Sequence, residues 1–172
     1  MKRTLILPLL LGLALVLAGC APSARQKAGE ALGLDLSAGT VLLDTDTHGG
    51  FHGDGAACLK LAFPDDALAG VLASDPAWKP LPLSDVTTAL VYGRTVEQDG
   101  TSISWGPYLT DEDGQPLVDP AVETGWYRFI DRHSQSQDPA DESGVLERGS
   151  LNFTLALYDA ERNELYYFTL DT

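Results

Sequence analysis

A glycine-rich stretch between residues 44 and 55 concentrates side chains that could bind a metal ion or exchange protons. Two of the three histidines of the chain lie in it, four positions apart, with aspartates on both sides. Imidazole nitrogens and carboxylate oxygens are suitable ligands for zinc and other divalent ions. The candidate ligands are Asp44, Asp46, His48, His52 and Asp54.

Three interpretations of this stretch remain open. The spacing of His48 and His52 matches no recognised metal motif, and in a loop it does not turn both imidazoles to the same side. Glycine and aspartate are also the residues that a tight structural loop requires. We therefore favour a structural loop. A contact to another ligand or partner is the second interpretation, and a divalent-metal site is the third.

The rest of the chain offers no recognised catalytic motif. The sequence lacks Gly-x-Ser-x-Gly, His-Glu-x-x-His, Cys-x-x-Cys, a phosphate-binding P-loop and a dinucleotide fingerprint. It therefore identifies no catalytic residue and leaves enzymatic activity open. We expect a non-catalytic binding or interaction module without a cofactor. The alternative is a metal-binding protein or metal-dependent hydrolase that uses the loop from His48 to His52.

The amino-terminal twenty residues have the three zones of an export signal. Lys2 and Arg3 precede an apolar segment of 13 residues, from Leu5 to Leu17, and small residues then lead to Cys20. A transmembrane helix needs roughly 20 apolar residues, so this segment is too short to be one. The order Leu-Ala-Gly-Cys at 17–20 resembles the lipobox of bacterial lipoproteins.

The resemblance covers residues 1–20 only, and it implies a lipid anchor. It implies transfer of a diacylglyceryl group to the Cys20 thiol and cleavage between Gly19 and Cys20. The chain would then divide into a signal peptide (1–19), a lipidated cysteine with a tether (20–38) and one globular domain (39–172). We expect a lipid-anchored protein of the cell membrane that faces outside the cytoplasm, with an envelope protein or a small ligand as its partner.

The acidic composition restricts the kinds of partner. The 172 residues carry a formal net charge of −14, which becomes −16 on removal of a signal that contains Lys2, Arg3 and no acidic residue. Such a charge repels nucleic acid and anionic lipid head groups. We therefore expect no nucleic-acid partner.

Cys58 is the only cysteine left once Cys20 carries a lipid, so no internal disulfide can form. Alternation along residues 57–63 places Cys58 on the side of Lys60, opposite Leu59. The only base that the sequence offers to activate the thiol is a possible neighbour in the loop from His48 to His52. We therefore interpret Cys58 as a half-buried structural thiol.

Hydrophobic patterns predict an α+β fold, in which a mostly antiparallel sheet of about five strands has two short helices inserted after the second strand. The expected strands cover residues 39–45, 57–63, 125–132, 151–158 and 165–170, and the last two form a hairpin. The expected helices lie within 64–75 and 84–93, with another short helix at 23–33 in the tether. Residues 94–124 are expected to form a loop, because Asp99-Gly100 and similar turn signals interrupt them.

The last expected strand has aromatic residues on both faces. Tyr166 and Phe168 share one face, and Tyr167 lies on the other. We favour sheet packing for these side chains over an exposed recognition surface, for which tyrosine is also suited.

Overall fold

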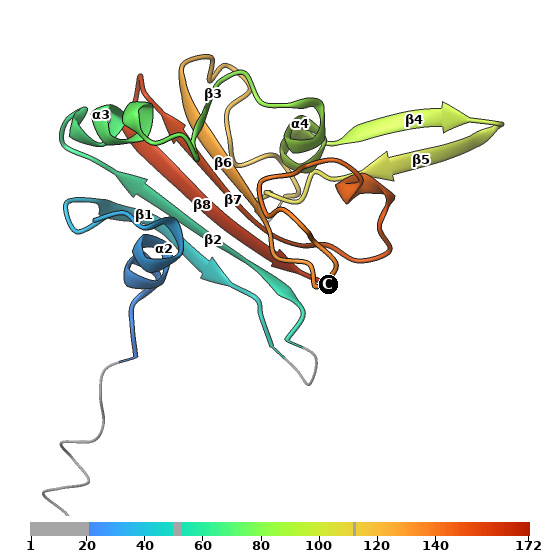
Figure 1. Ribbon diagram of the computed structural model, residues 1–172, viewed down its shortest axis with the longest axis horizontal. Coiled ribbons are helices and arrows are strands. Elements are labelled where there is room, and N and C mark those ends of the chain that lie inside the picture. The colour runs from blue at the N-terminus through green and yellow to red at the C-terminus, as the bar shows by residue number, and fades with distance from the viewer. Residues whose placement is uncertain (1–20, 50–52, 112) are drawn as a thin grey trace, which may run out of the picture.

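The computed structural model describes residues 21–49, 53–111 and 113–172, which form an α+β fold. In chain order the elements are α2 (Ala24–Leu32), β1 (Thr40–Asp46), β2 (Gly55–Ala62), α3 (Ala67–Ser74), β3 (Lys79–Pro80), α4 (Asp85–Tyr92), β4 (Arg94–Gln98), β5 (Thr101–Trp105), β6 (Gly125–Asp131), a 3-10 helix (Val145–Glu147), β7 (Asn152–Asp159) and β8 (Glu164–Asp171). Six strands form an antiparallel sheet in the order β1-β2-β8-β7-β6-β3, while β4 and β5 pair only with each other (Figure 1).

Most of the predicted elements are confirmed. The five expected strands correspond to β1, β2, β6, β7 and β8, and the two inserted helices correspond to α3 and α4. The sheet has one strand more than expected, because the dipeptide Lys79-Pro80 pairs with β6. The helix α2 begins after Ser23, whose side chain accepts a hydrogen bond from the backbone of Gln26, and it ends at Gly33 in the left-handed conformation. These are the caps that the sequence predicts.

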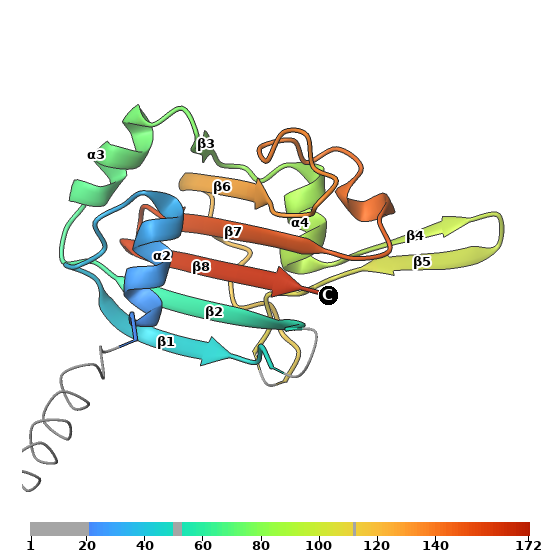
Figure 2. The same cartoon turned by 60° about the horizontal axis from the view of Figure 1, so that its bottom comes forward.

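The expectation of a loop over residues 94–124 is wrong for its first part. There β4 and β5 form a hairpin with Val96 opposite Ile103, and the hairpin extends away from the rest of the molecule (Figure 2). At its turn, Asp99 and Gly100 have φ angles of 51° and 77°, the positive values that a two-residue hairpin turn requires. The strands were missed because a hairpin without a core face has no strong apolar alternation.

The helix α2 packs on the sheet, although the sequence predicts that it belongs to a tether. Ala28, Leu32 and Leu36 are buried in this contact. The chain then turns back closely, since a Cβ atom at Gly29 would lie 2.8 Å from the carbonyl oxygen of Leu34. The residues that follow Ser23 therefore belong to the folded domain.

Separate hydrophobic clusters cover the two faces of the sheet. On one face, α4 and the segment around Val145 pack against Phe153 and Phe168. On the other face, α2 and α3 pack against Leu61 and Tyr158. The helix α2 crosses only part of its face, so the end of β8 that leads to the C-terminus is uncovered on that side (Figure 2).

Several residues of the sequence analysis lie outside the described residues. They are the signal of residues 1–19, Cys20 and His52. Within the described part of the chain, no helix is both long enough and apolar enough to cross a membrane.

Candidate functional site

A pocket of about 380 Å³ lies at the uncovered end of the sheet, next to α2. Residues of β2, β7 and β8 form its floor, α2 forms one wall, and β1 and the residues that follow it form the opposite side. The pocket therefore lies between segments that are far apart in the sequence but adjacent in the fold.

Small side chains leave this space open. Ala57, Thr169 and Thr154 lie opposite one another on the adjacent strands β2, β8 and β7, and all three line the pocket. On α2, the lining residues include Ala24 and Ala31. None of these side chains extends far from its backbone, so the helix and the sheet are not in close packing contact here.

The neighbouring row of the floor is larger and apolar. Leu59 and Tyr167 lie opposite each other on β2 and β8, and both line the pocket. Burial raises the pKa of Tyr167 above its ordinary value, because a low-dielectric environment disfavours the phenolate. The phenol is therefore neutral at physiological pH.

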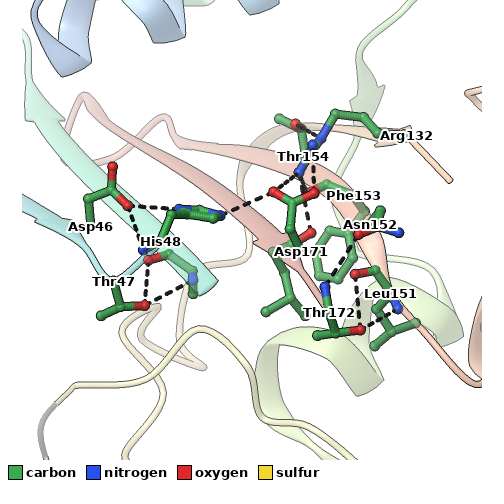
Figure 3. Close-up of polar contacts among 12 residues, drawn as sticks. Asp46, Thr47, His48, Arg132, Leu151, Asn152, Phe153, Thr154, Asp171 and Thr172 are labelled. Atoms are coloured by element: carbon green, nitrogen blue, oxygen red, sulfur yellow. Dashed lines mark hydrogen bonds and ion pairs between the residues drawn. The ribbon is translucent and has the colours of Figure 1, made fainter. Parts of the chain in front are cut away.

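His48 lies at the mouth of the pocket between two carboxylates (Figure 3). Its Nδ1 is 2.7 Å from Oδ1 of Asp46, and its Nε2 is 3.1 Å from Oδ2 of Asp171. Asp46 ends β1 and Asp171 ends β8, so the imidazole links the edge strand to the centre of the sheet.

Both ring nitrogens of His48 thus have a carboxylate within hydrogen-bond distance. A neutral imidazole has a single N–H to donate, so which of the two nitrogens donates depends on the tautomer. Hydrogen bonds from the backbone and the side chain of His48 in turn lower the pKa of Asp46, as expected for donors that favour the charged carboxylate.

Arg132 holds the other side of Asp171. Its Nη1 is 2.9 Å from Oδ1 and its Nη2 is 3.0 Å from Oδ2 of that carboxylate. The guanidinium also donates to the side chain of Thr154 and to the backbone carbonyls of Phe153 and Leu170. Arg132 is therefore fixed in the network and its charge is balanced by Asp171.

Local sequence positions His48 for these contacts. The carboxylate of Asp46 accepts a hydrogen bond from the backbone N–H of His48 at 2.9 Å, the Asx turn for which aspartate is suited. Gly55 lies against the same backbone, since a Cβ atom there would be 2.5 Å from the nitrogen of His48. A larger residue at position 55 would displace His48, so this glycine has a structural role.

The structure brings together only some of the predicted metal ligands. Asp44 and Asp46 lie on one face of β1 and line the pocket with His48, whereas Asp54 is exposed and lies outside its lining. Both nitrogens of His48 are used by carboxylates. Within residues 21–49, 53–111 and 113–172, no three histidine, cysteine or acidic side chains are arranged to hold a metal ion. Metal binding that involves His52 remains a prediction.

Cys58 packs in the hydrophobic core, as expected for a structural thiol, and it is more deeply buried than the sequence predicts. Cys58 is among the residues that line the pocket, but it is only 5% exposed and belongs to the core cluster that contains Phe168, its partner on β8. Burial raises the pKa of the thiol to about 11. At neutral pH the group is thus a protonated thiol and a poor nucleophile.

Lys27, Arg132 and Asp171 also line the pocket, although no motif in the sequence singled them out. Lys27 lies on the pocket wall and the other two lie at its rim. Alternation in the last strand places Asp171 on the same face as Tyr167, and this pattern could have identified Asp171 from the sequence. The pairing of β2 with β8 could not be predicted, because it joins residues more than a hundred positions apart.

Comparison with known proteins does not identify the chain. No protein-family description, no curated protein and no solved structure matches it.

Proposed function

We propose that this chain is a membrane-anchored lipoprotein, facing outside the cytoplasm, whose folded domain binds a small ligand without catalysis. The observation that carries the binding part is the pocket of about 380 Å³ between α2 and the open end of the sheet. Pockets of this size hold small molecules when they combine an apolar surface with a few polar groups. The anchoring part depends on the lipobox at residues 17–20.

The position of α2 supports a link between anchor and pocket. Ala24 is the first residue of α2, lines the pocket, and follows Cys20 by four positions. Four residues span at most about 14 Å even when fully extended. A lipid on Cys20 would hold this wall of the pocket close to the membrane surface.

The polar groups of the pocket support binding rather than catalysis. His48 is held on both sides by Asp46 and Asp171, so neither ring nitrogen is free to accept a proton from a substrate. Cys58 is only 5% exposed and belongs to the core cluster that contains Phe168. The described lining therefore holds no paired nucleophile and base.

The anchor is tested by metabolic labelling with palmitate. We expect label on the wild-type chain and on Cys58→Ala, and none on Cys20→Ser. The Cys58 variant is the matched control, because the chain has only these two cysteines. Label that persists in Cys20→Ser would contradict lipidation at this position.

The binding function is tested by filling the pocket from α2. Ala31→Leu adds a larger side chain at an exposed helical position of the pocket wall, where leucine is compatible with a helix. Ala67→Leu makes the same change at the exposed start of α3, outside the pocket lining. In a thermal-shift screen of small molecules, we expect hits on the wild type and on Ala67→Leu that are lost in Ala31→Leu. A hit set identical in both variants would contradict this placement of the site.

A further inference from the structure

The interior of the pocket is apolar and its charged groups lie at the rim. Ala57 and Leu59 form part of the floor, and Ala24 and Ala31 form part of the wall. The carboxylates that line it come from the ends of strands or from the edge strand β1. An apolar body can thus occupy the interior only if any charged group of the ligand remains at the rim.

Two basic groups at the rim already have acidic partners on the protein. Arg132 makes two contacts to the carboxylate of Asp171, and His48 lies between Asp46 and Asp171. An anionic ligand would have to compete with these carboxylates. Lys27 on the pocket wall makes no ion pair among the described residues. The lining nevertheless holds three carboxylates against only two side chains with a permanent positive charge, Lys27 and Arg132.

Asp44 is the carboxylate of the pocket lining that takes part in none of these contacts. It lies two residues before Asp46 on the same face of β1, its side chain is exposed, and it lines the pocket. Among the described residues, no hydrogen bond or ion pair involves its carboxylate. The formal charge of −14 adds a field that attracts cations to this rim and repels anions.

We propose that the pocket takes a small amphipathic cation. Its apolar body lies on the floor between α2 and the sheet, and its amine lies against the carboxylate of Asp44. This inference rests on the proposed binding function and names the class of ligand for that same site.

The assignment is tested with three probes, phenylbutylamine, phenylbutanol and phenylbutyrate. They share one apolar body and differ in their polar end. Binding is measured by calorimetric titration of the full chain in nanodiscs of zwitterionic lipid, with empty nanodiscs as the blank. We expect the amine to bind at least about tenfold more tightly than the carboxylate, with the alcohol between them. Roughly 1.4 kcal/mol corresponds to that tenfold difference.

Two variants with the same change of charge separate a local contact from the general field. Asp44→Asn removes the proposed partner of the amine, and Glu97→Gln removes one acidic charge on the β4–β5 hairpin. We expect Asp44→Asn to weaken amine binding about threefold, as the loss of one exposed ion pair does. The same variant should leave alcohol binding unchanged, and Glu97→Gln should change neither.

The outcomes distinguish the inference from the function on which it rests. Equal binding of all three probes, abolished by Ala31→Leu, would keep the binding site and overturn the cation assignment. An equal effect of Asp44→Asn and Glu97→Gln would likewise overturn the contact with Asp44. Absence of binding by all three probes, or binding that Ala31→Leu leaves intact, would contradict the proposed function as well.

Discussion

The carboxylate of Asp171 is shared between Arg132 and His48, with Nη2 of Arg132 at 3.0 Å and Nε2 of His48 at 3.1 Å from the same oxygen. Asp171 comes from the last strand, Arg132 follows β6, and His48 follows β1. One side chain thus fixes the relative positions of three segments at the mouth of the pocket (Figure 3).

Asp171→Asn is expected to destabilise the protein by about 1–2 kcal/mol, because it removes the charge that two basic groups contact while leaving both partly buried. Chemical denaturation followed by tryptophan fluorescence measures this change. Asp54→Asn, at an exposed acid outside the pocket lining, should change the free energy of unfolding by less than about 0.5 kcal/mol. Equal effects of the two substitutions would show that the network contributes little.

The contacts of Asp46 should make stability depend on pH in the acidic range. The hydrogen bonds from His48 lower the pKa of this carboxyl below its ordinary value of 3.8. A lowered pKa in the folded state stabilises the protein above the ordinary value, and the gain is lost as the pH falls through the folded value. The stability difference between wild type and Asp46→Asn should thus shrink as the pH falls below 3.8. A difference that does not change with acidification would contradict the contact.

Cys58 should react only when the protein unfolds. In residues 21–172 it is the single cysteine, and burial raises its pKa to about 11. At pH 9.0, the ordinary pKa of this thiol, we expect alkylation to be much slower in the folded protein than in protein unfolded by denaturant. Because the folded state holds the thiol proton more tightly, the stability due to this group is present below pH 9.0 and declines as the pH rises towards 11. Rapid labelling under native conditions would contradict the burial of the thiol.

A buried ion pair fixes the long connection between β6 and β7. Asp131 is 4% exposed, and one of its oxygens lies 2.6 Å from Nη1 of Arg148. Burial alone would raise the pKa of Asp131, but hydrogen bonds from Arg148 and from the backbone of His133 lower it. Arg148→Ala leaves a buried carboxylate with fewer partners and should cost about 2–4 kcal/mol.

The matched control is Arg94→Ala on the exposed β4–β5 hairpin. It should alter the free energy of unfolding by less than about 0.5 kcal/mol. A small loss in Arg148→Ala, comparable with that of the control, would mean that the connection is held by its other contacts.

The sequence predicts those parts of the fold that local patterns determine. Alternation identified five strands, and the caps Ser23 and Gly33 identified α2. The tether was assigned wrongly because Ala28 and Leu32 are buried only through their contact with the distant strands of the sheet. The β4–β5 hairpin was not predicted, because it buries few apolar side chains and its sequence therefore shows no clear apolar alternation.

The candidate site was predictable only in part. His48, Asp44 and Asp46 were singled out for their chemistry and line the pocket. Their function as a rim depends on Asp171 and Arg132, which are brought to them by the pairing of β2 with β8 and of β6 with β7. Pairings over such sequence distances leave no local signal in one sequence.

Native mass spectrometry of the protein released gently from its own membrane tests ligand binding by the pocket most directly. Wild type and Ala67→Leu should carry a small molecule that is absent from Ala31→Leu, because only the last substitution fills the pocket. If the bare polypeptide mass is found for the wild type, or if the same adduct remains in Ala31→Leu, then the pocket beside α2 does not hold the ligand.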